Sequence, residues 1–457
     1  MTLSNYSQLT DLQCQRARLA RDARFDGVFF VAVKTTGIFC RPICPANLPK
    51  EENVEYFDTQ AQALNAGYRP CLRCRPDSAP SSWAWRGVET TFIRALKMIE
   101  AGELHQSSVS EMSERLGISD RYLRLLFNKY LSMSPKQYAL YLQLMFAKQL
   151  LSASNMGVTD IAFASGFKSV RRFNDAFIKQ LKLTPSEIRS THSLEKVSNV
   201  IDLTVHGEIN WQFMLNFYRT RAIEGVEQIN ATSYQRTFKL NNCSGWFKAY
   251  PIQNKLRVEF ELTDISQLRG LVSQIRKMFD VDTDIAQVEN QLRLLSQPLI
   301  KYSGIRIPGV WNVWEAGVRA ILGQQVSVKS AITQLNLLVS NTNRKSSGCL
   351  YFPTPREILA IDLGFLRMPE SRKQTLRRFA EFYLNNPDSE VNDWLEIKGI
   401  GPWTTDYAKL RGLSLPNCFL ETDLVVKKML AKFPSLDRES VSPWGSYATF
   451  HCWSHQS

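Results

Sequence analysis

The chain has 457 residues, nine cysteines and a formal net charge of +13. It is longer than the range in which one hydrophobic core keeps growing, and it shows neither a signal peptide nor a run of about 20 apolar residues, so we expect a soluble, cytoplasmic, multidomain protein. The odd number of cysteines argues against a disulfide framework, and the positive charge favours a polyanionic partner, for which DNA, RNA and an anionic membrane surface all qualify.

Two polar segments interrupt the periodic parts of the chain. RPDSAPSSW, residues 75–83, and RSTHSLEKVSN, residues 189–199, contain few large apolar side chains and lie between segments with regular spacing. This composition is typical of linkers. The two linkers divide the chain into about 80 residues, then about 110, then the remainder.

The first part contains two close pairs of cysteines. Three residues separate Cys40 from Cys44, two separate Cys71 from Cys74, and 26 lie between the pairs. Because each pair can close on a metal through a tight turn, the four thiolates predict one tetrahedral Zn²⁺ site. One interpretation is a purely structural site, since closed four-cysteine sites usually support a fold.

Arginines surround these cysteines. Arg41, Arg69, Arg73 and Arg75 each lie within two residues of a ligand. Four thiolates on Zn²⁺ leave a net charge of about −2, which repels DNA phosphates unless arginines attract them. Zinc also keeps sulfur deprotonated and nucleophilic, so a ligand cysteine can double as an attacking group.

TTGIFCRPICPA and GYRPCLRCRPD, with the FVAVKTTGIFCRP lead-in, resemble the amino-terminal domain of Ada-type adaptive-response regulators over roughly residues 10–80. The resemblance implies that Cys40 accepts a methyl group from a DNA phosphotriester. A thiolate ligand would then become a thioether, and the charge of the site would change from about −2 to about −1. Because repulsion from DNA would fall, the repair event would become a binding switch.

Residues 108–130, SVSEMSERLGISDRYLRLLFNKY, have apolar residues at helical spacing with a break in the middle. The first helix is expected to end at Leu116, with a turn at Gly117 and a second helix that starts at Ser119 or Asp120. This is a helix-turn-helix pattern. The basic residues that we expect to contact DNA are Arg121 and Arg124.

The same pattern returns 49 residues later, with its turn at Gly166. The residues that open its second helix are Lys168, Ser169, Arg171 and Arg172. A helical stretch at residues 134–151 joins the two units, so two recognition helices could enter successive major grooves. The pattern resembles the AraC-type DNA-binding domain that follows the zinc domain in Ada-type proteins. The alternative is a helical bundle whose basic residues are only solvated.

After Asn199 three short segments alternate apolar and polar residues, as half-buried antiparallel strands do. They are YQRTFKL (234–240), GWFKAY (245–250) and LRVEFEL (256–262). From about Pro298 the spacing is helical to the end of the chain. We therefore expect a small antiparallel-sheet α+β layer followed by a helical body.

Within the helical body, LEIKGIGPWTTDYAKLRG predicts a helix-hairpin-helix motif. Gly399 and Gly401 free the backbone for a tight hairpin, and Pro402 suits the first position of the next helix. The amides of the hairpin and helix start would form a phosphate cradle, with Lys398 adding a positive charge. Alternatively, the segment is a tight connection between two helices.

Three further side chains carry possible chemistry. Trp403 and Tyr407 lie four residues apart on the same helix and project from one face, where the alternative role is core packing. Asp423 stands at the start of a later helix, where a carboxylate also interacts favourably with the helix dipole. The residues alone leave both alternatives open.

Four segments occur in the same order as in the AlkA-type 3-methyladenine DNA glycosylases: RIPGVWNVWEAGVRAILGQQVSV, FPTPREILA, IKGIGPWTTDYAKLRG and FLETDLVVKK. The resemblance runs from about residue 200 to the C-terminus. It implies that Asp423 is catalytic and that Trp403, Tyr407 and Trp453 line the base pocket. An alkylated purine is already cationic, so one carboxylate that stabilises an oxocarbenium-like sugar is sufficient, while aromatic rings stack on the flipped base.

Four departures from the related patterns refine this expectation. Trp403 stands where strand-cutting relatives have a Schiff-base lysine, so we expect base excision without lyase activity. Gln325 replaces a leucine wedge and is expected to contact DNA, and Leu424 replaces an aromatic residue, which would alter the breadth of the pocket. The second methyltransferase of Ada proteins, with its Pro-Cys-His-Arg motif, is missing, so we expect no O6-methylguanine repair.

The predicted fold class is multidomain α+β. The expected domains are a zinc domain at 1–80, an all-α double helix-turn-helix domain at 84–190, an antiparallel-sheet α+β domain at 200–290 and an all-α helix-hairpin-helix domain at 291–457. We expect a monomeric alkylation sensor and glycosylase that binds Zn²⁺, double-stranded DNA and RNA polymerase but no membrane. The alternative is a transcription regulator whose glycosylase-like half only binds DNA.

Overall fold

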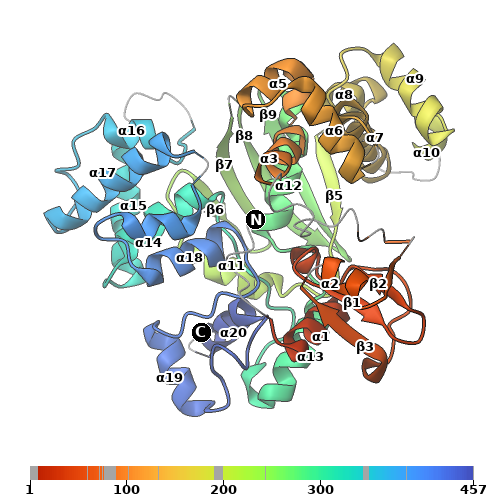
Figure 1. Ribbon diagram of the computed structural model, residues 1–457. Helices are drawn as coiled ribbons and strands as arrows, with labels where there is room; N and C mark the ends of the chain where they lie inside the picture. The colour runs from red at the N-terminus through yellow and green to blue at the C-terminus, as the bar shows by residue number, and fades with distance from the viewer. Residues whose placement is uncertain are drawn as a thin grey trace. The chain divides into compact units, whose positions relative to one another are not determined.

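A computed structural model of the chain is shown in Figure 1. The structure describes residues 9–58, 60–71, 73–74, 76, 89–100, 102–131, 133–189, 199–241, 243–342, 349–387 and 389–455. The chain forms two compact units: Met1–Ser152 with Gly157–Ser193, and Ala153–Met156 with Leu194–Ser457. Apart from residues 76, 189 and 199, the two expected linkers lie outside the described residues.

The cysteine-rich part of the first unit is built on a four-stranded sheet with the order β3-β1-β2-β4. The strands are β1 (Phe30–Val33), β2 (Ile38–Cys40), β3 (Val54–Phe57) and β4 (Arg69–Pro70), and the helices are α1 (Asp11–Ala20) and α2 (Gln60–Asn65), with 3₁₀ turns η2 (Ala23–Phe25) and η3 (Glu51–Asn53). Phe30, Ala32, Phe39 and Ala63 form its small buried core. Because β4 pairs parallel with β2, both strands end at the same edge of the sheet.

The remainder of the first unit is helical in the described residues. Its helices are α3 (Glu89–Glu100), α4 (Glu103–Gln106), α5 (Val109–Arg115), α6 (Asp120–Leu131), α7 (Pro135–Ala153), α8 (Val158–Ala164), α9 (Val170–Leu181) and α10 (Pro185–Arg189). Gly117 and Gly166 adopt φ of +70° and +84°, so each turn occupies the left-handed region that glycine tolerates. Both predicted helix-turn-helix units are therefore present, as α5–α6 and α8–α9.

The second unit begins with a five-stranded antiparallel sheet in the order β5-β9-β8-β7-β6. The strands are β5 (Val200–Thr204), β6 (Glu227–Ile229), β7 (Tyr234–Leu240), β8 (Cys243–Ile252) and β9 (Lys255–Leu262), drawn in yellow-green to green in Figure 1. The three predicted strands correspond to β7, β8 and β9, whereas the short outer strands β5 and β6 were not predicted.

Helices accompany this sheet before the helical body begins. They are α11 (Trp211–Arg219), α12 (Leu268–Met278) and α13 (Ile285–Leu295), with 3₁₀ turns η6 (Ile265–Gln267) and η7 (Gln297–Leu299). The boundary expected between residues 290 and 291 falls inside α13. Sheet and helical body also belong to the same compact unit.

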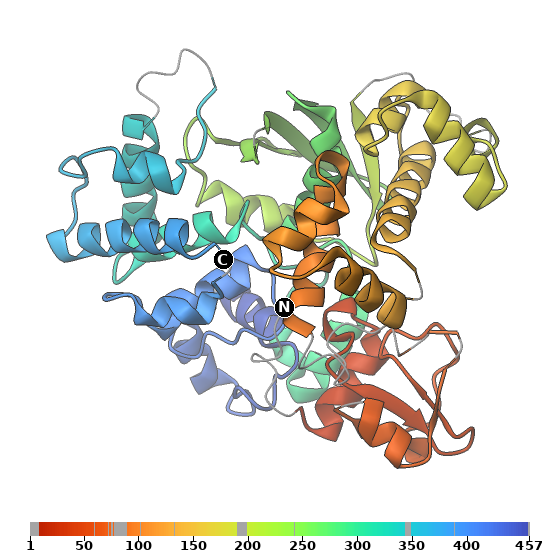
Figure 2. The ribbon, with the colours of Figure 1, turned by 45° about the horizontal axis from the view of Figure 1, so that its top comes forward.

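The helical body is the cyan-to-blue part of Figure 2. It contains α14 (Val313–Gly323), α15 (Val328–Thr342), α16 (Pro355–Leu359), α17 (Glu370–Asn385), η8 (Val391–Glu396), α18 (Pro402–Gly412), α19 (Leu424–Lys432) and α20 (Gly445–Ser454). Its core contains an aromatic group, in which Phe379 stacks on Trp314 at a centroid distance of 4.9 Å and lies edge-on to Trp394 at 4.6 Å. Throughout the described residues, every helix is too short or too polar to cross a bilayer.

Candidate functional site

The four predicted metal ligands lie together at one edge of the first sheet. Cys40 ends β2, Cys71 follows β4, and the Cys71 amide donates a hydrogen bond to the Phe39 carbonyl at 2.9 Å. The Arg41–Cys44 turn brings Cys44 back, and the Arg41 amide donates to Cys74 Sγ at 3.3 Å. All four Sγ atoms lie within 4.8 Å of one another, and we call this set the cysteine cluster.

The electrostatics of the cysteine cluster fit a divalent cation. A hydrogen bond from the Cys40 side chain lowers the pKa of the Cys74 thiol to about 6, while that same hydrogen bond and burial raise the pKa of Cys40. Because close sulfurs oppose further ionisation, all four become thiolates only with a compensating positive charge. Sulfurs on tetrahedral Zn²⁺ lie about 3.8 Å apart, within the spacing of this cluster. The predicted zinc site is thus supported by the structure.

The arginines near the cysteine cluster differ from one another. The Arg41 guanidinium is held by Asp26, with Nε donating to Oδ1 at 2.7 Å and a second contact to Oδ2. The Arg41 guanidinium therefore already has a carboxylate partner within the protein. Arg69 and Arg73 are exposed at the same edge of the sheet, whereas Arg75 lies outside the described residues.

The two predicted recognition helices expose the expected basic residues. Arg121 and Arg124 on α6, and Arg171 and Arg172 on α9, are all exposed. Ser169 is the N-cap of α9 and accepts a hydrogen bond from the Arg172 amide at 3.3 Å. At α6 the Ser119 hydroxyl accepts from the Tyr122 amide at 3.2 Å, so Ser119, not Asp120, is the capping side chain. Arg124 also pairs with Asp120 at 2.8 Å.

The predicted hairpin connects η8 to α18. Gly399 has φ +100°, and a Cβ there would overlap Oγ1 of Thr375 on α17, which itself donates to the Lys398 carbonyl at 3.2 Å. Gln324 Nε2 donates to the Gly399 carbonyl at 3.0 Å. The hairpin is thus fixed to two neighbouring helices.

The other hairpin residues have open surroundings. Gly401 is the N-cap of α18, Pro402 is its first residue as predicted, and a Cβ at Gly401 would meet nothing within 4 Å. Lys398 is exposed. A phosphate could therefore approach this side of the hairpin without displacing protein atoms.

Asp423 caps α19 and also faces a cavity. Its Oδ1 accepts hydrogen bonds from the amides of Val425 at 2.9 Å and Val426 at 3.3 Å, and from Trp453 Nε1 at 3.1 Å. The capping role considered from the sequence is therefore real. It does not compete with a second role, because Asp423 lines a cavity of about 770 Å³, which we call the Asp423 cavity.

Aromatic side chains form much of this cavity. Trp403 and Tyr407 of α18 stack on each other with centroids 5.4 Å apart and an interplanar angle of 27°. Trp453 of α20 stacks on Phe217 of α11 at 5.9 Å and 16°. All four rings line the Asp423 cavity, so the structure brings together every predicted pocket residue.

Two of the sequence departures have a structural outcome. Gln325 is exposed and has φ +54°. The nearby Val326 and Val328 line the Asp423 cavity and are 38% and 43% exposed, respectively. The side chain of Leu424 is 76% exposed and is absent from the cavity lining. Leu424 thus lies outside the wall of the Asp423 cavity, and its effect on pocket breadth stays a prediction.

Sequence reasoning missed the contribution of α11. Phe217 from this helix and Arg221, two residues beyond its end, line the Asp423 cavity. A signal was present, because Trp211, Met214, Leu215 and Tyr218 are buried at helical spacing after the N-cap Asn210.

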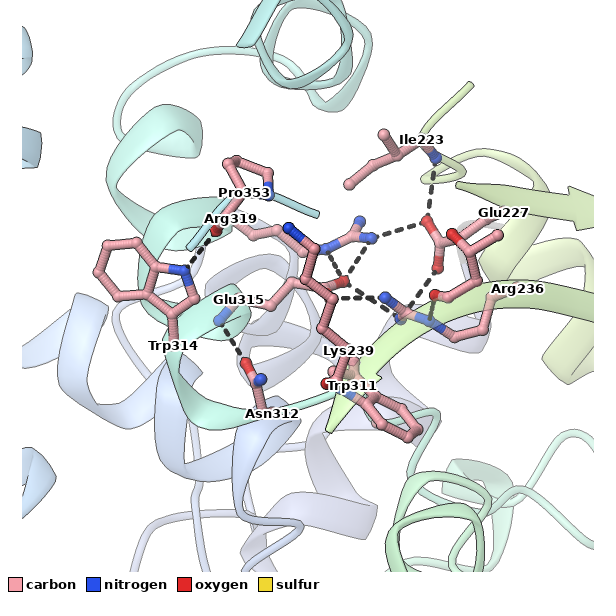
Figure 3. Close-up of polar contacts among 12 residues, drawn as sticks. Ile223, Glu227, Arg236, Lys239, Trp311, Asn312, Trp314, Glu315, Arg319 and Pro353 are labelled. Atoms are coloured by element: carbon pink, nitrogen blue, oxygen red, sulfur yellow. Dashed lines mark hydrogen bonds and ion pairs between the residues drawn. The ribbon is translucent and has the colours of Figure 1, made fainter. Parts of the chain in front are cut away.

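A second missed feature is a buried ion-pair cluster, drawn in Figure 3. It consists of Glu227, Arg236, Glu315 and Arg319. Arg236 pairs with Glu315 at 2.8 Å, and Arg319 bridges Glu315 at 2.8 Å and Glu227 at 2.7 Å. These side chains are at most 5% exposed. The cluster ties β6 and β7 to α14, beside the Asp423 cavity that Arg319 also lines.

Three family models match parts of the chain. They are the metal binding domain of Ada at residues 13–77, a helix-turn-helix domain at residues 112–191 and the AlkA N-terminal domain at residues 200–312. These matches confirm the resemblances inferred from the motifs.

Similar proteins include bifunctional activator/repair enzymes and a DNA glycosylase. A probable bifunctional transcriptional activator/DNA repair enzyme AlkA from Mycobacterium tuberculosis is 32% identical over 96% of this chain and 95% of its own length. The bifunctional transcriptional activator/DNA repair enzyme AdaA from Bacillus subtilis is 29% identical over 43% of this chain and 91% of its own length. DNA-3-methyladenine glycosylase 2 from Escherichia coli is 27% identical over 53% of this chain and 93% of its own length.

Proposed function

The chain belongs to the family of bifunctional transcriptional activator/DNA repair enzymes, and on this basis we propose that it senses DNA alkylation at the cysteine cluster and excises alkylated purines at the Asp423 cavity. The observation that carries the proposal is the meeting of one carboxylate with stacked aromatic rings in a single cavity. DNA binding without catalysis would require the hairpin but not this arrangement.

Excision begins when the damaged nucleotide leaves the base stack and enters the Asp423 cavity. Trp403, Tyr407 and Trp453 supply aromatic faces, and stacking on a cationic base contributes about 2 kcal/mol when the contact is desolvated. This offsets part of the few kcal/mol needed to flip the base. The aromatic lining therefore selects bases that already carry positive charge.

Asp423 supplies the charge for the chemical step. Three N–H donors hold Oδ1, so the carboxylate keeps one orientation as positive charge develops on the sugar. The C1′–N bond breaks with its electron pair on the base, and water then attacks C1′. Since residue 403 is a tryptophan and not a Schiff-base lysine, we propose excision without strand cutting.

The test is an excision assay on methylated duplex DNA with Asp423→Asn. Asparagine is an equally good N-cap, so α19 keeps its cap while the negative charge is lost. We expect the yield of abasic sites to fall at least about 10²-fold. Cys40→Ser serves as a matched control and should retain excision. Equal yields from wild type and Asp423→Asn would leave DNA binding as the only role of this half.

At the cysteine cluster, we propose that Cys40 accepts one methyl group in a single turnover. Zn²⁺ bound there would keep the four sulfurs as thiolates at neutral pH. Cys40 Sγ would attack the methyl carbon of a phosphotriester, and the C–O electron pair would return to the phosphate oxygen. Cys44 is buried, whereas Cys40 is partly accessible at the sheet edge.

The methylated cysteine cluster would carry less negative charge and bind DNA more tightly. We propose that this change directs α6 and α9 to a promoter, where a monomeric chain would contact RNA polymerase. The proposed division into functional parts remains 1–80, 84–190, 200–290 and 291–457.

Mass spectrometry tests the methyl transfer. After incubation with methylated DNA, the intact mass should increase by one methyl group, and peptide mapping should place it on Cys40. Methylation of Cys71 or Cys74 instead would contradict the role assigned to Cys40.

A further inference from the structure

The second helices of the two helix-turn-helix units, α6 and α9, expose different side chains. Their capping residues Ser119 and Ser169 are 50 residues apart, and Phe127 and Phe177 are buried at equivalent positions after them. Because the spacing is helical, the side of each helix opposite its buried residues is also made of equivalent positions. We call these two sets the recognition faces: Arg121, Arg124, Leu125 and Asn128 in α6, and Arg171, Asn174, Asp175 and Ile178 in α9.

Arg124 is held in one orientation by Asp120. Its Nε and Nη2 donate to the two carboxylate oxygens of Asp120 at 2.8 and 3.0 Å. A guanidinium has five N–H groups, so this pairing leaves two parallel donors at the Nη1 and Nη2 edge. Two parallel donors match the O6 and N7 acceptors that guanine presents in the major groove. The Asp120 pair thus orients Arg124 without using the donors that recognise guanine.

The equivalent positions in α9 carry different chemistry. Val170 stands at the place of Asp120, and Asn174 stands at the place of Arg124. The Asn174 side chain is partly exposed and has no hydrogen-bond partner within the described residues. An amide offers a donor and an acceptor side by side, which match the N7 acceptor and N6 donor of adenine.

The next position along each recognition face differs as well. Leu125 is 55% exposed, beside the charged side chain of Arg124. Asp175 is exposed and forms no ion pair in the part of the chain that the structure describes. An unpaired carboxylate on a DNA-facing helix repels phosphates unless a base donates to it, and cytosine N4 is the donor that typically does so. An apolar side chain instead contacts the methyl group of thymine.

We propose that the two recognition helices read different bases, so that the promoter site is asymmetric. In α6, Arg124 contacts a guanine and Leu125 contacts a thymine. In α9, Asn174 contacts an adenine and Asp175 contacts a cytosine. Asp120 is a positioning residue, because it acts on DNA only through Arg124. This inference rests on the promoter binding proposed above.

The experiment selects binding sites from a random duplex library with the full-length, zinc-bound chain, before and after methyl transfer. The selected sequence is then varied one base pair at a time, and affinities are measured by fluorescence anisotropy. Arg124→Ala should reduce the preference for guanine at one position about tenfold, and Asn174→Ala should do the same for adenine at another. Leu125→Ala and Asp175→Ala should relax the preference for thymine and for cytosine, respectively.

The difference between the helices allows a matched exchange. Val170→Asp combined with Asn174→Arg rebuilds the α6 pair in α9, and should change the preferred base at the Asn174 position from adenine to guanine. Asp120→Asn keeps Arg124 but removes its support, so the preference for guanine should fall about threefold at the Arg124 position alone. Lys129→Ala is the control, because it removes a positive charge from α6 outside the recognition face and should leave every base preference unchanged.

The outcomes separate this inference from the proposed promoter binding. Suppose that the wild type selects a sequence, but Arg124→Ala relaxes a position that is not guanine, or the exchange in α9 leaves adenine preferred. The base assignment is then wrong, and promoter binding stands. If the wild type selects no sequence in either state, the proposed promoter binding fails, and this inference fails with it.

Discussion

The two candidate reactive centres are built in different ways. The cysteine cluster draws its four ligands from residues 40–74, and two short parallel-paired strands bring them to one edge. The Asp423 cavity draws its walls from α11, α14, α15, α18, α19 and α20, across residues 210–453. The first centre depends on a metal and local turns, whereas the second depends on the packing of a large core.

This difference predicts that the two centres respond differently to damage. The small sheet around the cysteine cluster belongs to a short part of the chain with a small hydrophobic core, which we do not expect to hold its fold without the metal. The Asp423 cavity is supported by a large hydrophobic core and by the buried ion-pair cluster. We therefore expect that a change which inactivates one centre leaves the other active.

Removal of zinc should have the largest effect. Structural zinc sites contribute about 10 kcal/mol or more, so chelation should unfold the sheet around the cysteine cluster and abolish methyl acceptance. Base excision by the same chelated sample should persist. Methyl transfer, excision and zinc content would be measured together, with a zinc-replenished sample as the control. Loss of excision on chelation would show that the two centres depend on one another.

A substitution in the buried ion-pair cluster should have the converse effect, impairing the Asp423 cavity and sparing the cysteine cluster. Glu315→Gln removes the carboxylate shared by Arg236 and Arg319, and leaving buried charges uncompensated costs about 3–5 kcal/mol. Chemical denaturation should show this loss, and excision should fall while methyl acceptance remains. Glu357→Gln is the matched control, since its pair with Lys239 is 41% and 36% exposed and contributes at most about 1 kcal/mol.

The hairpin should show a smaller effect. Gly399→Ala places a side chain at φ +100° against Thr375, which costs about 1–3 kcal/mol and disturbs the hairpin. We expect DNA affinity and excision to fall about tenfold, as measured by fluorescence anisotropy and base release. At Gly401 a Cβ would meet open space and φ is an extended −119°, so Gly401→Ala should lose much less DNA affinity and excision. Equal losses would argue against a positional requirement at Gly399.

Features that depend on local spacing could be predicted from the sequence. The two cysteine pairs close through short turns, and Gly117, Gly166 and Pro402 act within their own turns or helix starts. Asp423, Trp403, Tyr407 and Trp453 were assigned through resemblance: helical spacing places Trp403 beside Tyr407, but nothing in the sequence requires Asp423 and Trp453 to meet them. Their common cavity arises from the packing of α18, α19 and α20.

Long-range partners could not be predicted. Arg236 meets Glu315 across 79 positions and Arg319 meets Glu227 across 92, so no periodic pattern connects them. Arg41 was predicted to contact DNA because it adjoins Cys40, and the structure adds a partner that the sequence did not indicate, Asp26, 15 positions away. The sequence shows which residues adjoin a charged residue along the chain. Its ion-pair partner depends on how the strands and helices pack, which the sequence does not show.

The engagement of Arg41 leads to the smallest predicted effect, on the cysteine side of the comparison. Asp26→Asn should release the Arg41 guanidinium at the edge that also exposes Arg69 and Arg73, and should raise the affinity of the unmethylated chain for DNA about three- to tenfold at low salt. The gain should disappear at high salt, because it comes from phosphate attraction. Glu52→Gln makes the same change in net charge at a side chain that is 72% exposed, without freeing an arginine. If both variants bind DNA equally well, net charge and not Arg41 controls affinity, and Asp26 has no part in restraining a phosphate clamp.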